Sequence, residues 1–144
     1  AVRVEEWLKE AVGRGAKLWA GGPRQGLVIP PSLVEGAPAD CKVSCEEVFG
    51  PVATLEAVDS RQKALERLAD TKYGLQAGIF TNDLRFAHEA FDRLSVGGLV
   101  INDIPSYRSD AMPYGGVKES GQGREGVRYA IEEYTNRRTM VVKP

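Results

Sequence analysis

Short apolar segments alternate with amphipathic segments through the middle of the chain, and this alternation constrains the fold more than any other feature. Residues 52–58, 77–80 and 99–101 have the composition of strands. Between them, two segments repeat apolar residues every three or four positions, one following Asp59 and one following Asp83, which predicts two helices capped by these carboxylates. Strands and helices in this order predict an α/β fold, with a mostly parallel open sheet and flanking helices.

The ends of the chain add further expected elements. Apolar residues recur at helical spacing from residue 4 to residue 12 and stop at glycines, which predicts a first helix. Residues 17–20 and 27–29 predict short strands, and we expect the following pair of prolines to break the structure after them. A last helix is predicted from residue 127, with its apolar face formed by Val127, Ala130, Ile131 and Tyr134.

Residues 139–142 predict a terminal strand that has no partner later in the chain. An unpaired strand edge promotes association, so this strand has to pair backwards or with another subunit. The chain begins at Ala1, directly in a helical pattern, from which we expect a segment of a longer protein.

Length and charge narrow the possible functions. The 144 residues suit one domain with a substantial core, and 19 basic against 20 acidic residues create no general field for nucleic acid or anionic membranes. No apolar run is long enough to span a bilayer, and the first residues lack the order of a signal peptide. We therefore expect a cytoplasmic protein with neither nucleic acid nor membrane as a partner.

The cysteines and the single histidine do not indicate catalysis or metal binding. Cys41 and Cys45 are four positions apart, which is the spacing of neither a redox pair nor half of a zinc site. No histidine lies nearby in sequence to activate either thiol, and His88 lies off the apolar stripe of a predicted helix. We expect no catalytic residue and no metal site in this chain.

The segment from Cys45 to Pro51 combines two carboxylates, an aromatic ring and a forced bend. Gly50 followed by Pro51 turns the chain away from helix. Beside the bend, the Glu47 carboxylate can accept two hydrogen bonds from sugar hydroxyls, and Phe49 can pack against a flat heteroaromatic ring. The alternative is a solvated carboxylate and an ordinary core phenylalanine, and these seven residues alone leave both readings open.

Two more segments carry candidate functional residues. The loop over residues 104–116 contains two tyrosines and an arginine, and its length and aromatic content favour a functional loop over disorder. Gly121, Gly123 and Gly126 match the dinucleotide-binding fingerprint, but the residues before them do not resemble a strand. We interpret them as the glycine-rich entry to the last helix.

Several ordered motifs together resemble the C-terminal third of the NAD(P)-dependent aldehyde dehydrogenases. They include Glu-Glu-Val-Phe-Gly-Pro-Val from residue 46, Pro-Tyr-Gly-Gly-Val-Lys from residue 113 and Ser-Gly-Gln-Gly-Arg-Glu-Gly from residue 120. The resemblance covers nearly the whole chain. It implies that residues 1–135 are part of the catalytic domain and that residues 136–144 are an oligomerisation strand, forming a homo-oligomer.

The resemblance also implies the chemistry of the parent protein. In that family a cysteine thiolate adds to the aldehyde, hydride passes to NAD or NADP, and a glutamate-activated water releases the acid. That cysteine and that glutamate lie upstream of the part represented here, so we expect the chain alone to be inactive. The family pattern assigns Glu47 to the nicotinamide-ribose hydroxyls and Phe49 to the nicotinamide.

The same resemblance places the long loop in the wall of the substrate pocket. Tyr107 and Tyr114 would line the aldehyde channel, and Arg108 would bind the carboxylate or phosphate of a small acidic or phosphorylated aldehyde. The alternative for Arg108 is an ordinary surface arginine. For the whole chain, the competing hypothesis is a non-catalytic assembly module that retains the fold for its terminal strand.

Overall fold

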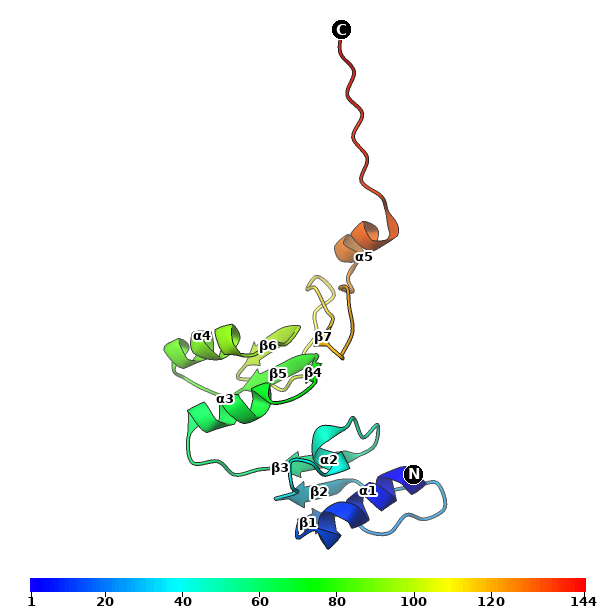
Figure 1. Cartoon of the computed structure of the whole chain (residues 1–144), viewed down its shortest axis with the longest axis vertical. Coiled ribbons are helices and arrows are strands. Elements are labelled where there is room, and N and C mark those ends of the chain that lie inside the picture. The colour runs from blue at the N-terminus through cyan, green and yellow to red at the C-terminus, as the bar shows by residue number, and fades with distance from the viewer. The chain divides into compact units, whose positions relative to one another are not determined.

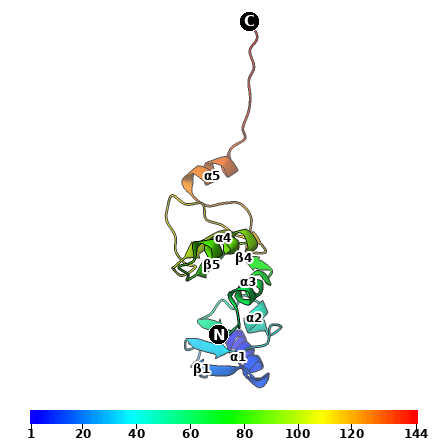
Figure 2. The same cartoon turned by 90° about the vertical axis from the view of Figure 1, so that its left-hand side faces the viewer.

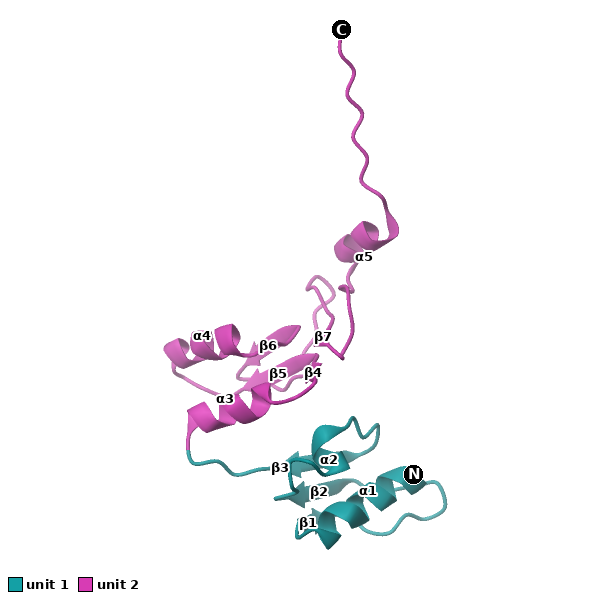
Figure 3. Ribbon diagram, viewed as in Figure 1, with its two compact units in different colours: residues 1–59 teal, residues 60–144 magenta.

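The computed structural model describes residues 1–144, which divide into two compact units, Ala1–Asp59 and Ser60–Pro144 (Figure 3). In the first unit the elements, in chain order, are α1 (Val2–Gly13), β1 (Lys17–Ala20), β2 (Ser32–Glu35), α2 (Lys42–Cys45) and β3 (Val52–Leu55) (Figure 1). The second unit contains α3 (Arg61–Ala69), β4 (Tyr73–Gly74), β5 (Gln76–Ile79), α4 (Leu84–Arg93), β6 (Gly98–Ile101), β7 (Val117–Lys118) and α5 (Val127–Tyr134).

Helix α1 carries the largest part of the core of the first unit. Its predicted stripe is confirmed, because Val4, Leu8 and Ala11 are buried at successive turns. The helix ends before Gly15, whose φ of +99° lies in a region that glycine adopts without strain. The buried residues that share this core are Val4, Leu8, Ala11, Ala16, Val34, Cys41 and Val43.

The sheet of the first unit differs from the sequence prediction in its middle strand. The strand expected at residues 27–29 is wrong: only an isolated bridge joins Gln25 and Val28. The strand comes after the two prolines, at Ser32–Glu35, where it pairs antiparallel with β1 and parallel with β3. A proline removes a hydrogen-bond donor only at its own position, so a strand can begin directly after it. The β3 strand is shorter than predicted.

The helices of the second unit pack on a separate core. Asp83 caps α4 as predicted, accepting hydrogen bonds from the backbone N–H groups of Arg85 and Phe86. The cap of α3 is Ser60, not Asp59, and its Oγ accepts from the Lys63 N–H at 3.1 Å. The core consists of Leu65, Ile79, Phe86, Ala90 and Leu94. Phe91, in the same helix, is 67% exposed.

The α/β fold class with flanking helices is confirmed. Strands β2 and β3 pair in parallel, as do β5 and β6, while β1 with β2 and β4 with β7 are antiparallel. The strands are distributed over three small sheets. Strand β4 begins at Tyr73, directly after the loop that follows α3. Strand β7 occupies residues 117–118, where the sequence had not indicated a strand.

Helix α5 forms at the predicted place, but it buries none of its residues. Val127, Ile131 and Tyr134 are all exposed. The residues that follow are extended and form no strand within this chain (Figure 2). The oligomerisation strand at residues 136–144 therefore stays a prediction. None of the helices in the chain is both long and apolar enough to cross a membrane.

Candidate functional site

The bend of the first unit, at Gly50 and Pro51, is held by hydrogen bonds before and after it. Arg3 donates from Nη2 to the carbonyl of Val48 at 2.6 Å. After the bend, Val52 N–H donates to Gly50 O at 2.8 Å, and Ser32 N–H donates to Pro51 O at 2.8 Å, so that the turn runs directly into the parallel β2–β3 pair. These bonds fix the backbone on which Glu47 and Phe49 are carried.

Phe49 has an unusual conformation for an aromatic residue. Its φ is +46°, in the left-handed region, and its side chain is 80% exposed in this chain. Left-handed backbone is uncommon outside glycine, and such outliers cluster at ligand-binding sites. Glu47, two residues before it, is also exposed. The turn thus displays a hydrogen-bond acceptor and an aromatic face, which suits a ligand with hydroxyl groups and a flat ring.

A shallow pocket of about 400 Å³ adjoins the bend. Its lining residues come from the bend and from the first two residues of β2 and β3, with Ala20 and Pro31 beside them; they are Ala20, Pro31, Ser32, Leu33, Gly50, Pro51, Val52 and Ala53. The pocket therefore lies where the two parallel strands begin, next to the segment that carries the predicted cofactor-binding residues.

In the second unit, the long loop between β6 and β7 is fixed where it begins and where it ends. At its start, Asn102 Oδ1 accepts the backbone N–H of Thr81 at 2.7 Å. At its end, Gly97 passes so near Gly115 that a Cβ on Gly97 would overlap the Gly115 carbonyl oxygen. Arg124 donates from Nη1 to Gly116 O at 2.9 Å. The loop is thereby tied to the glycine-rich segment that precedes α5.

Two of the predicted substrate residues lie together in this loop. The guanidinium carbon of Arg108 is 4.3 Å from the centroid of the Tyr114 ring, which is a cation–π contact. Arg108 Nη2 also donates to Glu125 Oε2 at 2.7 Å. Tyr107 is half exposed, and its carbonyl accepts a hydrogen bond from Gln76 Nε2 at 3.3 Å. The structure thus brings Arg108 and Tyr114 together and adds Glu125 to them.

Sequence reasoning missed Glu125. It had placed this residue only in the glycine-rich entry to the last helix. Glu125 and Tyr114 form an isolated antiparallel bridge. The Tyr114 N–H donates to Glu125 O with an N···O distance of 3.1 Å, and the Glu125 N–H donates to Tyr114 O with an N···O distance of 2.6 Å. This bridge brings the Glu125 side chain back to Arg108, which is 17 positions earlier. The only signal in the sequence was that Arg108 and Glu125 carry opposite charges. Their separation along the chain matches neither the helical nor the strand period, so it does not predict that they meet.

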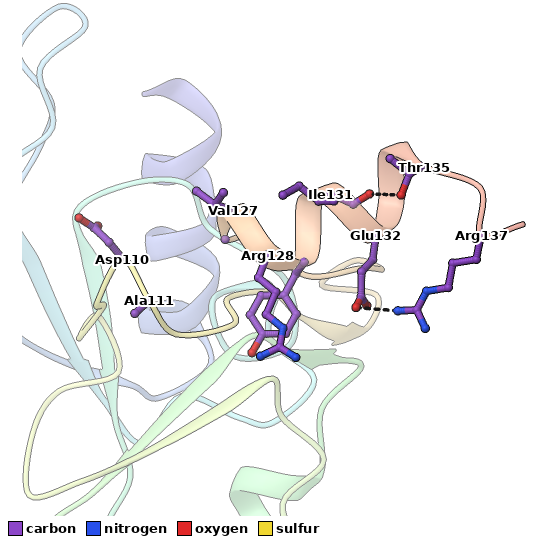
Figure 4. Close-up of a pocket in the computed structure, with 10 residues that line it drawn as sticks. Asp110, Ala111, Val127, Arg128, Ile131, Glu132, Thr135 and Arg137 are labelled. Carbon is purple, nitrogen blue, oxygen red and sulfur yellow. Dashed lines mark hydrogen bonds and ion pairs between the residues drawn. The ribbon is translucent and has the colours of Figure 1, made fainter.

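Tyr114 and Glu125 line a pocket of about 580 Å³. Its other walls are the glycine-rich segment and one side of α5, including Glu133 and Tyr134. A second pocket of about 820 Å³ lies between α5 and residues 110–111 of the loop (Figure 4). In that view Val127 and Ile131 extend from α5, and the Glu132–Arg137 ion pair, at 2.7 Å, lies at the end of the helix.

The two cysteines and the histidine, for which the sequence indicated no functional role, do not line these pockets. Cys41 is buried in the first core, and Cys45 is exposed with its Sγ 3.7 Å from the carbonyl oxygen of Asp40. Asp40 pairs with Arg14 at 2.8 Å, and this hydrogen bond lowers the pKa of the carboxyl. His88 is exposed on α4. No group of three potential metal ligands gathers in the chain.

A sequence model of the aldehyde dehydrogenase family matches residues 1–140. The chain belongs to this family. The prediction made from the ordered motifs is confirmed. Among curated relatives of the family, the 3-sulfolactaldehyde dehydrogenase of Priestia aryabhattai is 50% identical over 142 residues, which are 99% of this chain and 30% of that relative.

Solved aldehyde dehydrogenase structures show the same fold. Aldehyde dehydrogenase 21 from Physcomitrella patens, in complex with the reaction product succinate, has a TM-score of 0.87 and 46% identity over 90% of this chain and 27% of that one. Glyceraldehyde-3-phosphate dehydrogenase from Methanocaldococcus jannaschii, complexed with NADP, has a TM-score of 0.88 and 39% identity over 94% and 29%. The chain thus spans about a third or less of the length of each of these family members.

Proposed function

We propose that this chain is the C-terminal part of an aldehyde dehydrogenase that oxidises an aldehyde to a carboxylic acid with NAD or NADP. The observation that carries the proposal is the fixed bend that displays Glu47 and Phe49, in a chain that matches the family over residues 1–140. A bound dinucleotide would supply the hydride acceptor. The nucleophilic cysteine and the base lie upstream, outside these residues.

Glu47 and Phe49 would bind and orient the cofactor. The Glu47 carboxylate would accept hydrogen bonds from the two hydroxyls of the nicotinamide ribose, which is a charge-assisted interaction. The ring of Phe49 is exposed and would pack against the nicotinamide. The left-handed backbone of Phe49, together with its exposed ring, supports this role, because such backbone outliers cluster at ligand-binding sites.

Arg108 would bind the far end of an acidic aldehyde, with Tyr107 and Tyr114 lining the channel. The contact with Tyr114 helps to position the guanidinium, and a planar guanidinium suits carboxylate, sulfonate and phosphate groups. Three relatives support an acidic substrate: one is named a 3-sulfolactaldehyde dehydrogenase, one is in complex with its product succinate, and one is named a glyceraldehyde-3-phosphate dehydrogenase.

Residues 136–144 would form a strand with a neighbouring subunit, giving a homo-oligomer.

The test of this function compares the isolated 144-residue chain with the full-length protein that carries it. Each is incubated with small aldehydes and NAD or NADP, and reduced cofactor is followed by absorbance. We expect turnover only from the full-length protein. Turnover by the isolated chain would refute the proposal that its nucleophile lies outside these 144 residues. If neither the isolated chain nor the full-length protein turned over, a non-catalytic assembly module would be favoured.

The acidic substrate class has its own test, the Arg108→Leu variant of the full-length enzyme. We expect kcat/KM to fall about tenfold or more for an aldehyde with a terminal carboxylate or phosphate, since a charged hydrogen bond is lost. A neutral aldehyde of similar length should be affected far less. Equal losses on both classes would show that Arg108 is an ordinary surface arginine.

A further inference from the structure

The ion pair between Arg108 and Glu125 bears directly on the proposed substrate site, on which this inference rests. The guanidinium that would attract an acidic aldehyde is already in contact with a carboxylate, Nη2 to Oε2 at 2.7 Å. The Arg108 and Glu125 side chains are 49% and 65% exposed, so that both are open to solvent. Glu125 and Tyr114 also line the same pocket.

The contact leaves most of the guanidinium available. A guanidinium has five N–H donors, and Glu125 is bonded to Nη2 only. An incoming anion therefore finds free donors on Arg108, but it meets a positive charge that Glu125 has partly neutralised. The anion must either share the guanidinium with Glu125, against like-charge repulsion, or displace it. Exposed ion pairs are weak, so displacement is accessible.

We propose that Glu125 is a positioning residue that sets the anion specificity of the site through Arg108. Its carboxylate holds the guanidinium in place and offsets its charge, which lowers the affinity for acidic aldehydes and leaves neutral aldehydes unaffected. The backbone of Glu125 pairs with Tyr114 through N–H and C=O groups alone. Substitution of the Glu125 side chain therefore leaves the bridge that shapes the loop intact.

The test is the Glu125→Gln variant of the full-length enzyme, assayed with a carboxylate-terminated aldehyde and with a neutral aldehyde of similar length. Glutamine keeps the size of the side chain and an acceptor for Arg108, but not the charge. We expect KM for the acidic aldehyde to fall on the order of two- to fivefold, the range for an exposed ion pair. We expect the neutral-aldehyde KM to change far less. Higher salt should shrink the difference.

Two further variants separate charge from structure. Glu125→Ala removes the same charge and should shift the acidic-aldehyde KM in the same direction, which keeps the proposal testable if the glutamine variant folds poorly. Glu89→Gln removes the charge from another exposed pair of this unit, with Arg93 at 3.1 Å, and should change neither KM. A structural disturbance would raise KM or lower kcat for both aldehydes, not lower one KM.

The Arg108→Leu background distinguishes the possible failures. In it, Glu125→Gln should no longer change the acidic-aldehyde KM. If Arg108→Leu is selective for acidic aldehydes and Glu125→Gln alone leaves their KM unchanged or raised, the inference on Glu125 is overturned while the proposed function stands. If Arg108→Leu affects both aldehydes equally, the anion site itself is overturned, and the inference with it.

Discussion

The guanidinium carbon of Arg108 lies 4.3 Å from the centroid of the Tyr114 ring, six residues along the same loop. The Met112 N–H donates to Ser109 O at 3.1 Å and closes a turn between these residues, and the Tyr114 ring contacts the cation that we assign to substrate binding. An exposed cation–π contact contributes about 0.5–1 kcal/mol, which corresponds to a two- to fivefold change in affinity.

This contact predicts different outcomes for two substitutions of Tyr114 in the full-length enzyme. Tyr114→Phe keeps the ring and should leave KM for an acidic aldehyde unchanged. Tyr114→Leu removes the ring and should raise that KM about two- to fivefold. Steady-state kinetics on acidic and neutral aldehydes measure both effects. Identical behaviour of the two variants would argue against the cation–π contact as the role of Tyr114.

Glu47 is predicted to act on the cofactor and not on the aldehyde. In the full-length enzyme, Glu47→Gln weakens hydrogen bonds that a carboxylate makes to two ribose hydroxyls, and we expect KM for NAD or NADP to rise about tenfold or more. The aldehyde KM should stay constant. Fluorescence titration with the dinucleotide gives a direct Kd. Glu6→Gln, an exposed carboxylate on α1, is the matched control; an equal effect there would contradict a specific contact.

Asp83 predicts a defined pH dependence of stability. Arg61 donates to its Oδ2 at 2.7 Å, and this bond, with those from the Phe86 and Arg85 N–H groups, lowers the pKa of Asp83. Because the folded state favours the ionised carboxylate, the stabilisation is complete above the unfolded pKa of about 3.9. It is lost as the pH falls through the lower, folded pKa.

The Asp83→Asn variant isolates this titration from that of the other carboxylates. Asparagine still caps a helix but does not ionise in this range, so its contribution should not change with pH. We expect urea unfolding of the 144-residue chain to show wild type losing free energy of unfolding relative to the variant below about pH 4. A constant difference between pH 3 and pH 6 would contradict the prediction.

The exposed apolar residues near the end of the chain lead to a prediction about how many subunits assemble. Met140, Val141 and Val142 are exposed and unpaired in the chain, and we propose that they form a strand against a neighbouring subunit. Deleting residues 139–144 from the full-length protein should lower the mass measured by analytical ultracentrifugation to that of a smaller assembly. Deleting only residues 143–144 is the control. An unchanged mass after the longer deletion would place the subunit contact elsewhere.

Local patterns were sufficient to predict the elements that are stabilised locally. The stripe of Val4, Leu8 and Ala11 defined α1, and Asp83 marked the beginning of α4, because helix periodicity and capping involve residues within four positions of one another. The ordered motifs were sufficient for the family. An error arose where neighbouring choices were locally equivalent: Ser60 caps α3 in place of Asp59.

The candidate site shows the same division between sequence and tertiary structure. The types of residue at Glu47, Phe49 and Arg108, and the bend at Gly50 and Pro51, were determined by the sequence alone. The left-handed backbone of Phe49 and the return of Glu125 to Arg108 were decided only by the tertiary structure. These features depend on contacts between segments far apart in the chain, such as Arg3 with Val48 and Tyr114 with Glu125, which no local period encodes.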